Sequence, residues 1–459
     1  MRVKASLLLA LLLAAAPTSA QPRQPTPYDR AIAAGYKALT LCSAIFQAGR
    51  RQADVEALEL TGIYPDYDAL LPSLETQVDR EGRTVSVRFD PALPPRLAHH
   101  WAGDGCTIYP IGAAELPQQA DRAVRHLARN PEAARRWPQF DAGAVARPRG
   151  DAAALRRTIE GAMATGYGER TRTTAVIVVQ QGRIVSEVYA PGFDMHTSQR
   201  TWSVAKSLAG TITGVAVRRG LIGVDRPAPV PEWQAPGDPR AGITTDQLLR
   251  MASGLHSDHA GNRTDAIYFG GTAVTEQAVD WPLEVAPGSR FRYANNDILL
   301  AIRGLRAVLP QDEQRYFPAQ MLFDAIGMHH TVAEPDWRGN YILSSQVWST
   351  ARDLARVGLL WLNDGVWQGE RLLPEGWIAY MTRPSGPQPT QGPGYGATMW
   401  LFGPAQGLPE NSYAAQGNRG QYVMVVPSRN IVIVRRGEDP AGARFGIARF
   451  TADVLAALR

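Results

Sequence analysis

Short runs of β-branched and aromatic residues mark two places along the chain. Residues 174–180 (TAVIVVQ) and 183–189 (RIVSEVY) are separated by a Gln-Gly pair, and this arrangement predicts a β-hairpin. Residues 421–426 (QYVMVV) and 431–435 (IVIVR) flank a turn and predict a second hairpin near the C-terminus. Strands are therefore expected at both ends of the segment that begins near residue 174.

Between the hairpins, apolar positions recur with the period of a helix. Strands at both ends with helices between them favour an α+β fold, in which an antiparallel β-sheet is flanked by helices, over a βαβ array. An all-helical subdomain is expected as an insertion at roughly 220–340. The pattern predicts helices at 203–219, 245–251, 296–308, 349–363 and about 443–458.

The first twenty residues have the pattern of a signal peptide. Arg2 and Lys4 precede an apolar run at 7–16, and small residues stand before a cleavage point after Ala20. The run is too short to cross about 30 Å of hydrocarbon, and no later segment has about 18 uninterrupted apolar residues. We expect an exported protein, periplasmic or secreted, without stable membrane insertion after cleavage.

Residues 21–150 form an N-terminal extension to which the sequence assigns no role. Pro-containing turns alternate there with short helical stretches, and an Arg-rich run of mixed charge extends over 121–157. This run predicts a pair of amphipathic helices with a solvated face. Residues 142–150 are typical of a linker, so the second unit is expected to span 151–459.

Composition and charge narrow the classes of protein. The chain has 459 residues, of which 45% are hydrophobic and 20% charged, and this excludes a disordered chain or a disulfide-dense miniprotein. The net charge of +5, two units of it from Arg2 and Lys4, is too small to indicate a nucleic-acid partner. Only Lys4, Lys37 and Lys206 are lysines among 48 cationic residues. Each retained lysine is therefore a candidate for a role that arginine cannot fill.

The two cysteines, Cys42 and Cys106, take their interpretation from the compartment. An oxidising environment favours one disulfide between them. A pair of buried, unlinked thiols is the alternative, because two cysteines do not by themselves fix the geometry of a bond.

Common hydrolase signatures and metal motifs are absent from the sequence. It contains no G-x-S-x-G, H-E-x-x-H or Walker A pattern. The adjacent pairs His99-His100 and His329-His330 make poor metal clamps, because neighbouring side chains on a regular element diverge. Residues 256–259 (HSDH) could hold a cation, but a polar loop with its own hydrogen bonds is the favoured interpretation. We expect no metal and no organic cofactor.

The strongest chemical feature is Ser203-x-x-Lys206 at the start of a predicted helix. Residues three apart share a helix face, so the serine hydroxyl and the lysine amine can meet. A serine nucleophile needs a base, and lysine serves only when neutral. A helix N-terminus and limited solvent lower a lysine pKa, whereas arginine does not deprotonate in proteins. An ordinary serine and lysine in one helix remain the alternative.

A second element follows about ninety residues later. Tyr293-Ala294-Asn295 stands just before an apolar helix, after PGSRFR. A phenol near Lys206 would share its proton and pass it to a leaving group. Together the two motifs are far more specific than either alone.

With these motifs, the sequence resembles the serine β-lactamase and penicillin-binding-protein superfamily. Within it, the class C-like branch of esterases and 6-aminohexanoate-dimer hydrolases is the most similar. The resemblance covers about 167 to the C-terminus and implies a β-lactamase/transpeptidase-like fold. It also implies that Ser203 is the acylated nucleophile, Lys206 and Tyr293 the proton-transfer pair, and Asn295 a hydrogen-bonding support. The matching segments are TWSVAKS, ITTDQLLRMASGL, APGSRFRYANND, STARDLARVGLLWLNDGVWQGERLLPEGW and AAQGNRGQYVMVVPSRNIVIV.

The third family motif departs from the expected Lys-Thr-Gly. It falls on Ala415-Gln416-Gly417, so the lysine that normally helps hold a substrate carboxylate is missing, and Arg419 is the nearest candidate substitute. The backbone amide of Asn418 is still expected to pair with that of Ser203 as an oxyanion hole, because a backbone donor does not depend on the side chain.

The sequence therefore predicts an exported serine hydrolase that cleaves a small ester or amide through an acyl-enzyme on Ser203. A β-lactamase or D-alanyl-D-alanine peptidase is the alternative within the family. A non-catalytic binding or sensor protein on the same scaffold is the alternative of another class.

Overall fold

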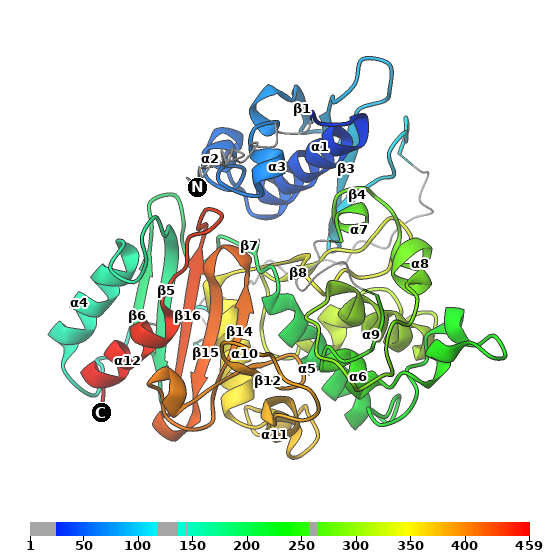
Figure 1. The fold of residues 1–459 in the computed structure, drawn as a ribbon. Helices are drawn as coiled ribbons and strands as arrows, with labels where there is room; N and C mark the ends of the chain where they lie inside the picture. The colour runs from blue at the N-terminus through cyan, green and yellow to red at the C-terminus, as the bar shows by residue number, and fades with distance from the viewer. Residues whose placement is uncertain (1–23, 117–135, 144, 257–263) are drawn as a thin grey trace, which may run out of the picture.

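A seven-stranded antiparallel sheet organises the C-terminal two thirds of the molecule. In this computed structural model, residues 24–116, 136–143, 145–256 and 264–459 are described. The segment 1–20 and much of the Arg-rich run therefore lie outside the described residues. Figure 1 shows the sheet beside a helical half, with the N-terminal region above their junction. The strand order is β12 (Gly394–Tyr395), β13 (Trp400–Phe402), β14 (Ser412–Gly417), β15 (Gln421–Val426), β16 (Ile431–Gly437), β5 (Thr173–Gln180) and β6 (Arg183–Tyr189).

Both predicted hairpins are confirmed and become neighbours in the sheet. Strand β16 pairs with β5 in antiparallel register, with Ile433 opposite Val178. The turn between β5 and β6 places Gln181 and Gly182 at φ of 49° and 77°. Positive φ at both positions matches the twist of the flanking strands, which explains the glycine there.

Strand β5 is buried on both faces, which accounts for its continuous apolar run. Val176 and Val178 pack against α4 (Ala152–Met163) and α12 (Ile447–Ala457), which cover one face of the sheet. Ile177 and Val179 point to the opposite core, where α10 (Ala351–Leu362) packs on β5, β15 and β16. The predicted helices 349–363 and 443–458 correspond to α10 and α12.

The helical half lies beside the sheet and is formed largely by residues between β6 and β12 in the chain. The helices predicted at 203–219, 245–251 and 296–308 are present there. This half contains a strand as well, because β8 (Val332–Ala333) pairs with β9 (Val347–Ser349), which in turn pairs with β7 (Gln199–Arg200). The inserted region is therefore not entirely helical. No described helix is both long and apolar enough to cross a bilayer. The main helices are α5 (Val204–Arg218), α6 (Thr245–Leu249), α7 (Asp265–Tyr268), α8 (Val274–Gln277), α9 (Asn295–Val308) and α11 (Trp377–Thr382).

The N-terminal region contains a sheet that the sequence pattern did not predict. Its four strands are antiparallel, short and partly polar, so they lack the apolar runs that marked the other strands. The helix α1 packs on them. The elements are α1 (Pro27–Cys42), α2 (Gln52–Ala57), α3 (Pro65–Asp68), β1 (Thr76–Asp79), β2 (Thr84–Val87), β3 (Arg96–Trp101) and β4 (Gly105–Ile108).

A disulfide joins Cys42, at the end of α1, to Cys106 in β4. The Cα atoms are 6.1 Å apart, and both side chains are buried. The predicted pairing is therefore present, and it ties the long helix to the sheet on which it packs.

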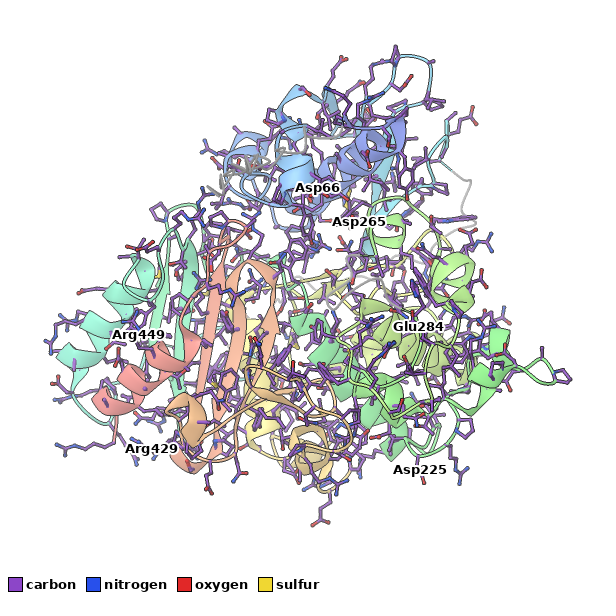
Figure 2. All side chains as sticks on the ribbon, viewed as in Figure 1. Asp66, Asp225, Asp265, Glu284, Arg429 and Arg449 are labelled. Carbon is purple, nitrogen blue, oxygen red and sulfur yellow. A yellow bond between two sulfur atoms is a disulfide. The ribbon has the colours of Figure 1, made fainter. Side chains whose placement is uncertain are left out.

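The N-terminal region is packed closely against the helical half. The buried Arg96 guanidinium donates to the carbonyls of Tyr109 in its own region and Gly270 across the junction. The ring of Tyr36 lies 4.7 Å from that of Phe269, and Tyr67 bonds to Asp265, which Figure 2 labels at this junction. These contacts fix the extension over the rest of the protein.

Candidate active site

Ser203 lies at the first turn of α5, where a strained backbone presents it. Trp202 adopts φ of 51°, in the left-handed region, and Ser203 follows as the residue that begins the helix. The Thr201 amide bonds to the Val347 carbonyl at 2.8 Å, which anchors this turn to β9. Ser203 remains partly exposed, so its hydroxyl is accessible to a substrate.

Lys206 is 1% exposed, and its amine meets Ser203 as the i, i+3 spacing predicted. Its Nζ lies 2.9 Å from Ser203 Oγ, 2.7 Å from Asn295 Oδ1 and 2.8 Å from the carbonyl oxygen of Ser344. The last two groups only accept hydrogen bonds, so they take the two N–H groups of a neutral amine. The lone pair of that amine is then left for the Ser203 hydroxyl.

Burial is the main reason that the pKa of Lys206 falls to about 7. The charge of Arg200 lowers the pKa further. The sequence interpretation invoked the helix N-terminus and limited solvent, and the structure identifies desolvation and this nearby arginine as the causes. At neutral pH a substantial fraction of the amine is therefore available as a base.

Tyr293 and Asn295 come from the start of α9, on the other side of the serine. Lys206 Nζ is 5.1 Å from the centroid of the Tyr293 ring. Burial raises the pKa of Tyr293, and a hydrogen bond to Ser203 offsets part of that rise. The phenol therefore stays protonated near pH 7 and is placed to donate. Asn295 lies beside Lys206 as its hydrogen-bonding support.

The end of β14 approaches the nucleophile closely enough to require glycine. A Cβ on Gly417 would lie 2.3 Å from the Thr201 carbonyl oxygen and 3.1 Å from the Ser203 nitrogen. The next residue, Asn418, lines the same cavity as Ser203. This arrangement suits two backbone donors for a developing oxyanion.

These groups open into a cavity of about 370 Å³ that is rich in aromatic side chains. None of the described residues that line it carries a charge. Gln416 reaches the cavity, whereas Ala415 is fully buried in the core. The lining residues are Tyr64, Trp202, Ser203, Tyr268, Tyr293, Asn295, Ser345, Trp400, Gln416, Gly417 and Asn418.

Arg419, the nearest candidate in sequence to substitute for the missing lysine, does not line the cavity. Its guanidinium donates to the carbonyls of Leu58, Glu59 and Thr61 in the N-terminal region, and its Nε lies 2.9 Å from Glu438. These acceptors hold the side chain in the junction between the two regions, away from the cavity.

Several site residues had no signature in the sequence. Ser344 supplies a backbone carbonyl to Lys206, and a carbonyl leaves no trace in residue type. Tyr64, Tyr268 and Trp400 come from three distant segments, and each is the kind of aromatic residue that usually lies in a core. Trp202 directly precedes Ser203 in the sequence, and this adjacency was the one local signal that an aromatic residue lines the cavity.

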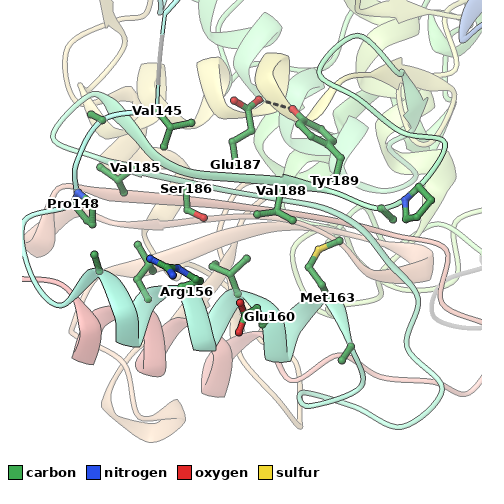
Figure 3. A pocket seen from close by; sticks show the side chains of 17 residues that line it. Val145, Pro148, Arg156, Glu160, Met163, Val185, Ser186, Glu187, Val188 and Tyr189 are labelled. Carbon is green, nitrogen blue, oxygen red and sulfur yellow. Dashed lines mark hydrogen bonds between the residues drawn. The ribbon is translucent and has the colours of Figure 1, made fainter.

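A larger cavity, of about 840 Å³, lies between α4 and β6. Its lining is mostly apolar and includes Met163, Val185 and Val188 (Figure 3). The polar side chains Glu187 and Tyr189 bond to each other at 2.6 Å. No lysine is among the described lining residues, so this cavity lacks the Ser–Lys pair found at Ser203 and is the weaker candidate for the chemistry.

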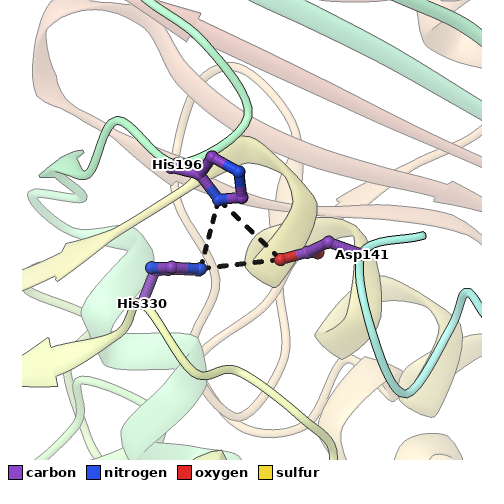
Figure 4. A group of neighbouring side chains, drawn as sticks. All are labelled: Asp141, His196 and His330. Atoms are coloured by element: carbon purple, nitrogen blue, oxygen red, sulfur yellow. Dashed lines mark hydrogen bonds and ion pairs between the residues drawn. The ribbon is translucent and has the colours of Figure 1, made fainter. Parts of the chain in front are cut away.

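One described cluster has the residue types of a metal site. His330 Nε2 and His196 Nδ1 lie 3.5 and 3.9 Å from Asp141 Oδ2 and 3.3 Å from each other (Figure 4). Arg356 donates to the other oxygen of Asp141 at 2.7 Å, and Arg352 lies nearby. These cations already balance the carboxylate, so the group is best described as an ion-pair cluster that ties residues 136–143 to α10. His329 takes no part in it.

The His256 segment does not supply a described cation site. His256 Nδ1 contacts Glu284 Oε1 at 2.5 Å, and residues 257–259 lie outside the described residues.

Comparisons with known proteins relate most of the chain to one family. The family model described as Beta-lactamase matches residues 155–457. A 6-aminohexanoate-dimer hydrolase from Paenarthrobacter ureafaciens is 27% identical over 309 residues, which are 59% of this chain and 74% of that protein.

Solved structures share the fold at low identity. A penicillin-binding protein homologue from Pyrococcus abyssi, described as octameric, has a TM-score of 0.52 at 18% identity, over 67% of this chain and 78% of that one. A penicillin-binding protein homologue from Caulobacter crescentus has a TM-score of 0.50 at 18% identity, over 69% of this chain and all of that one. The expected fold class is confirmed.

Proposed function

Because the chain belongs to the beta-lactamase family of serine hydrolases, we propose that it cleaves a carboxylic ester or amide through an acyl-enzyme on Ser203. The observation that carries this proposal is the set of contacts around Lys206. Two acceptors hold its N–H groups, and the third contact, at 2.9 Å, is to the Ser203 hydroxyl. This is the arrangement that a neutral lysine base needs.

In the acylation step, Lys206 takes the Ser203 proton while Oγ attacks the substrate carbonyl carbon. The carbonyl electrons move to oxygen, and the amides of Ser203 and Asn418 stabilise the resulting oxyanion. When the tetrahedral intermediate collapses, the bond to the leaving group breaks and Tyr293 donates a proton to that group. The proton held by Lys206 then restores the phenol. Water hydrolyses the acyl-enzyme by the same proton transfers in reverse order.

The cellular location is part of the proposal. The disulfide between Cys42 and Cys106 suits an oxidising compartment, and residues 1–20 have the pattern of a signal peptide. We infer an exported enzyme that needs no metal or organic cofactor.

Cleavage of β-lactams or D-alanyl-D-alanine peptides is the less favoured activity. Those substrates carry a carboxylate, which a lysine of the third motif would normally help hold. Position 415 is alanine in this chain, and the guanidinium of Arg419 bonds to the N-terminal region instead. The Paenarthrobacter relative is named a 6-aminohexanoate-dimer hydrolase, and that name favours a substrate other than a β-lactam.

The proposal is tested by labelling and by activity profiling. A fluorophosphonate probe should label Ser203, as mapped by mass spectrometry, and turnover of esters or amides should disappear in Ser203→Ala. Nitrocefin and benzylpenicillin should be turned over weakly or not at all. Absence of labelling together with absence of turnover would favour a binding or sensor protein, and rapid penicillin turnover would favour the β-lactamase alternative.

A further inference from the structure

We propose that Tyr64 of the N-terminal region is a specificity-determining wall of the Ser203 cavity, which selects uncharged substrates with an aromatic or bulky apolar group beside the scissile bond. This inference rests on the proposed hydrolase function and adds the substrate class to it. It also gives residues 21–150 a role in recognition.

Tyr64 reaches the cavity from just before α3. Its partly buried ring lies 6.3 Å from the ring of Trp202 in an edge-to-face arrangement, and Trp202 directly precedes the nucleophile. Tyr64 also packs against Tyr36 and Tyr67, at 6.1 and 5.7 Å between ring centroids. The side chain therefore joins the aromatic cluster of the N-terminal region to the catalytic turn.

The segment 58–64, which carries Tyr64, is bonded to residues that follow strands β14 and β16 of the seven-stranded sheet. The Ala441 amide donates to the Gly62 carbonyl at 2.6 Å, and the Gly62 amide donates to Asp68 at 2.7 Å. Gly62 has φ of 67°, and a Cβ there would lie 2.6 Å from Pro440. Three carbonyls of residues 58–61 accept from the Arg419 guanidinium. A wall anchored in this way loses little freedom when a substrate binds, which favours selectivity.

Arg419 links this segment to the oxyanion donor as well. It directly follows Asn418 and adopts φ of 57°, in the left-handed region. Its side chain is 3% exposed, and its charge is balanced by the carbonyls and by Glu438. The N-terminal region thus holds the Arg419 guanidinium away from the cavity.

Arg200, a second arginine near the nucleophile in sequence, is also engaged by protein groups. The Arg200 guanidinium stacks 3.8 Å above the Trp202 ring and donates to Ser345 Oγ at 2.8 Å. It is 7% exposed and is not among the lining residues. None of the described residues that line the cavity is a cation, so among them a substrate carboxylate would find no charge to replace its hydration, which is costly. Aromatic walls instead suit an apolar or aromatic group.

The first test uses Tyr64→Ala, the conservative variant Tyr64→Phe and the control Tyr28→Ala. Tyr28 is in the same region, is 54% exposed and does not line the cavity. We measure kcat and KM for p-nitrophenyl phenylacetate and p-nitrophenyl acetate. In Tyr64→Ala, the ratio of kcat/KM for the aromatic ester to that for acetate should fall about tenfold, mainly through KM. Tyr64→Phe should keep the wild-type ratio, and Tyr28→Ala should leave the ratio unchanged.

The second test concerns charge. The folded wild-type enzyme should cleave the p-nitrophenyl ester of pentanoic acid at least about 100-fold better than the mono-p-nitrophenyl ester of glutaric acid, which carries a free carboxylate. Gln416→Lys, which puts a cation into the cavity, should reduce this preference. Equal cleavage of both esters by the wild type would overturn the assignment of an uncharged substrate.

The outcomes separate this inference from the proposed function. Ser203-dependent cleavage with an ester ratio unchanged in a Tyr64→Ala variant of normal Tm overturns the role of Tyr64 alone. If Tyr64→Ala has a lowered Tm, the Tyr64→Leu variant is measured instead. A fall in its ratio of kcat/KM for the aromatic ester to that for acetate supports the inference, and an unchanged ratio overturns it. Cleavage that survives in Ser203→Ala, or no cleavage at all, overturns both proposals.

Discussion

The N-terminal region and the active site each bury a lysine, but the two lysines meet different partners. Lys37 in α1 donates to the carbonyls of Leu71 and Leu74 at 3.0 and 2.9 Å and lies 4.0 Å from Glu56. Lys206 in α5 also donates to two carbonyl-type oxygens, and its third contact is the Ser203 hydroxyl.

Burial lowers the pKa of both lysines, so burial alone does not distinguish them. The charge of Glu56 opposes the effect at Lys37, whereas Arg200 adds to it at Lys206. In the described structure, the hydrogen bonds of Lys206 include none to a carboxylate. The neighbouring charge and the third partner therefore separate a structural lysine from a candidate base.

The largest expected effect comes from Lys206→Arg. A guanidinium does not deprotonate in proteins, so it cannot accept the Ser203 proton. We expect kcat to fall about 10²- to 10⁴-fold, the range that general-base catalysis usually supplies. Steady-state kinetics with the best ester substrate measure the loss, and circular dichroism checks that the fold survives.

Two further variants test whether the loss in Lys206→Arg comes from proton transfer. Lys206→Met, which removes the amine without a larger group, should lose activity as well. Tyr293→Phe should also be impaired, and combining it with Lys206→Arg should cost much less than the sum, because the two residues transfer one proton together. An arginine variant that keeps most of its turnover would show that Lys206 is structural, like Lys37.

Breaking the disulfide should destabilise the N-terminal region without touching the chemistry. The bond joins residues 64 positions apart, and in the chain-entropy model a loop of this size contributes about 4 kcal/mol. We expect Cys42→Ala/Cys106→Ala to lower the free energy of unfolding by about that amount in guanidinium titrations. Two alkylatable thiols in the native protein would contradict the pairing.

Lys37→Met should affect stability and leave the catalytic rate constant unchanged. It leaves the buried carbonyls of Leu71 and Leu74 without their donor, and such loss costs about 1–3 kcal/mol. Thermal unfolding and kcat are measured on the same sample. A lower kcat at unchanged stability would mean that Lys37 influences the active site.

The smallest expected effect is a pH dependence that belongs to Lys206. Because its pKa is lowered to about 7, the amine is mostly neutral above this pH and protonated below it. The value of kcat/KM should fall about tenfold for each pH unit below 7 and level off above about pH 8. The same profile is expected for Lys37→Met. A rate that does not change between pH 5 and pH 8 would contradict a lysine base.

The catalytic motifs were predictable because they are local. Ser203 and Lys206 share a helix face at a spacing of three, and Tyr293-x-Asn295 precedes a helix that presents both side chains. The hairpins of the central sheet followed in the same way from their β-rich runs. The strands of the N-terminal region escaped prediction because they are short and partly polar, so their pairing rather than their composition defines them.

The sequence by itself determined the class of fold and supplied the candidate reacting groups, because helix periodicity and strand runs are properties of neighbouring residues. Only the tertiary structure placed Tyr64 beside Trp202, set the carbonyl of Ser344 against Lys206, and engaged Arg419 with Leu58, Glu59 and Thr61. Those contacts join segments more than a hundred residues apart and depend on backbone atoms or on aromatic rings that look like any core residue. The shape and charge of the cavity therefore depend on how the N-terminal region packs against the rest of the chain.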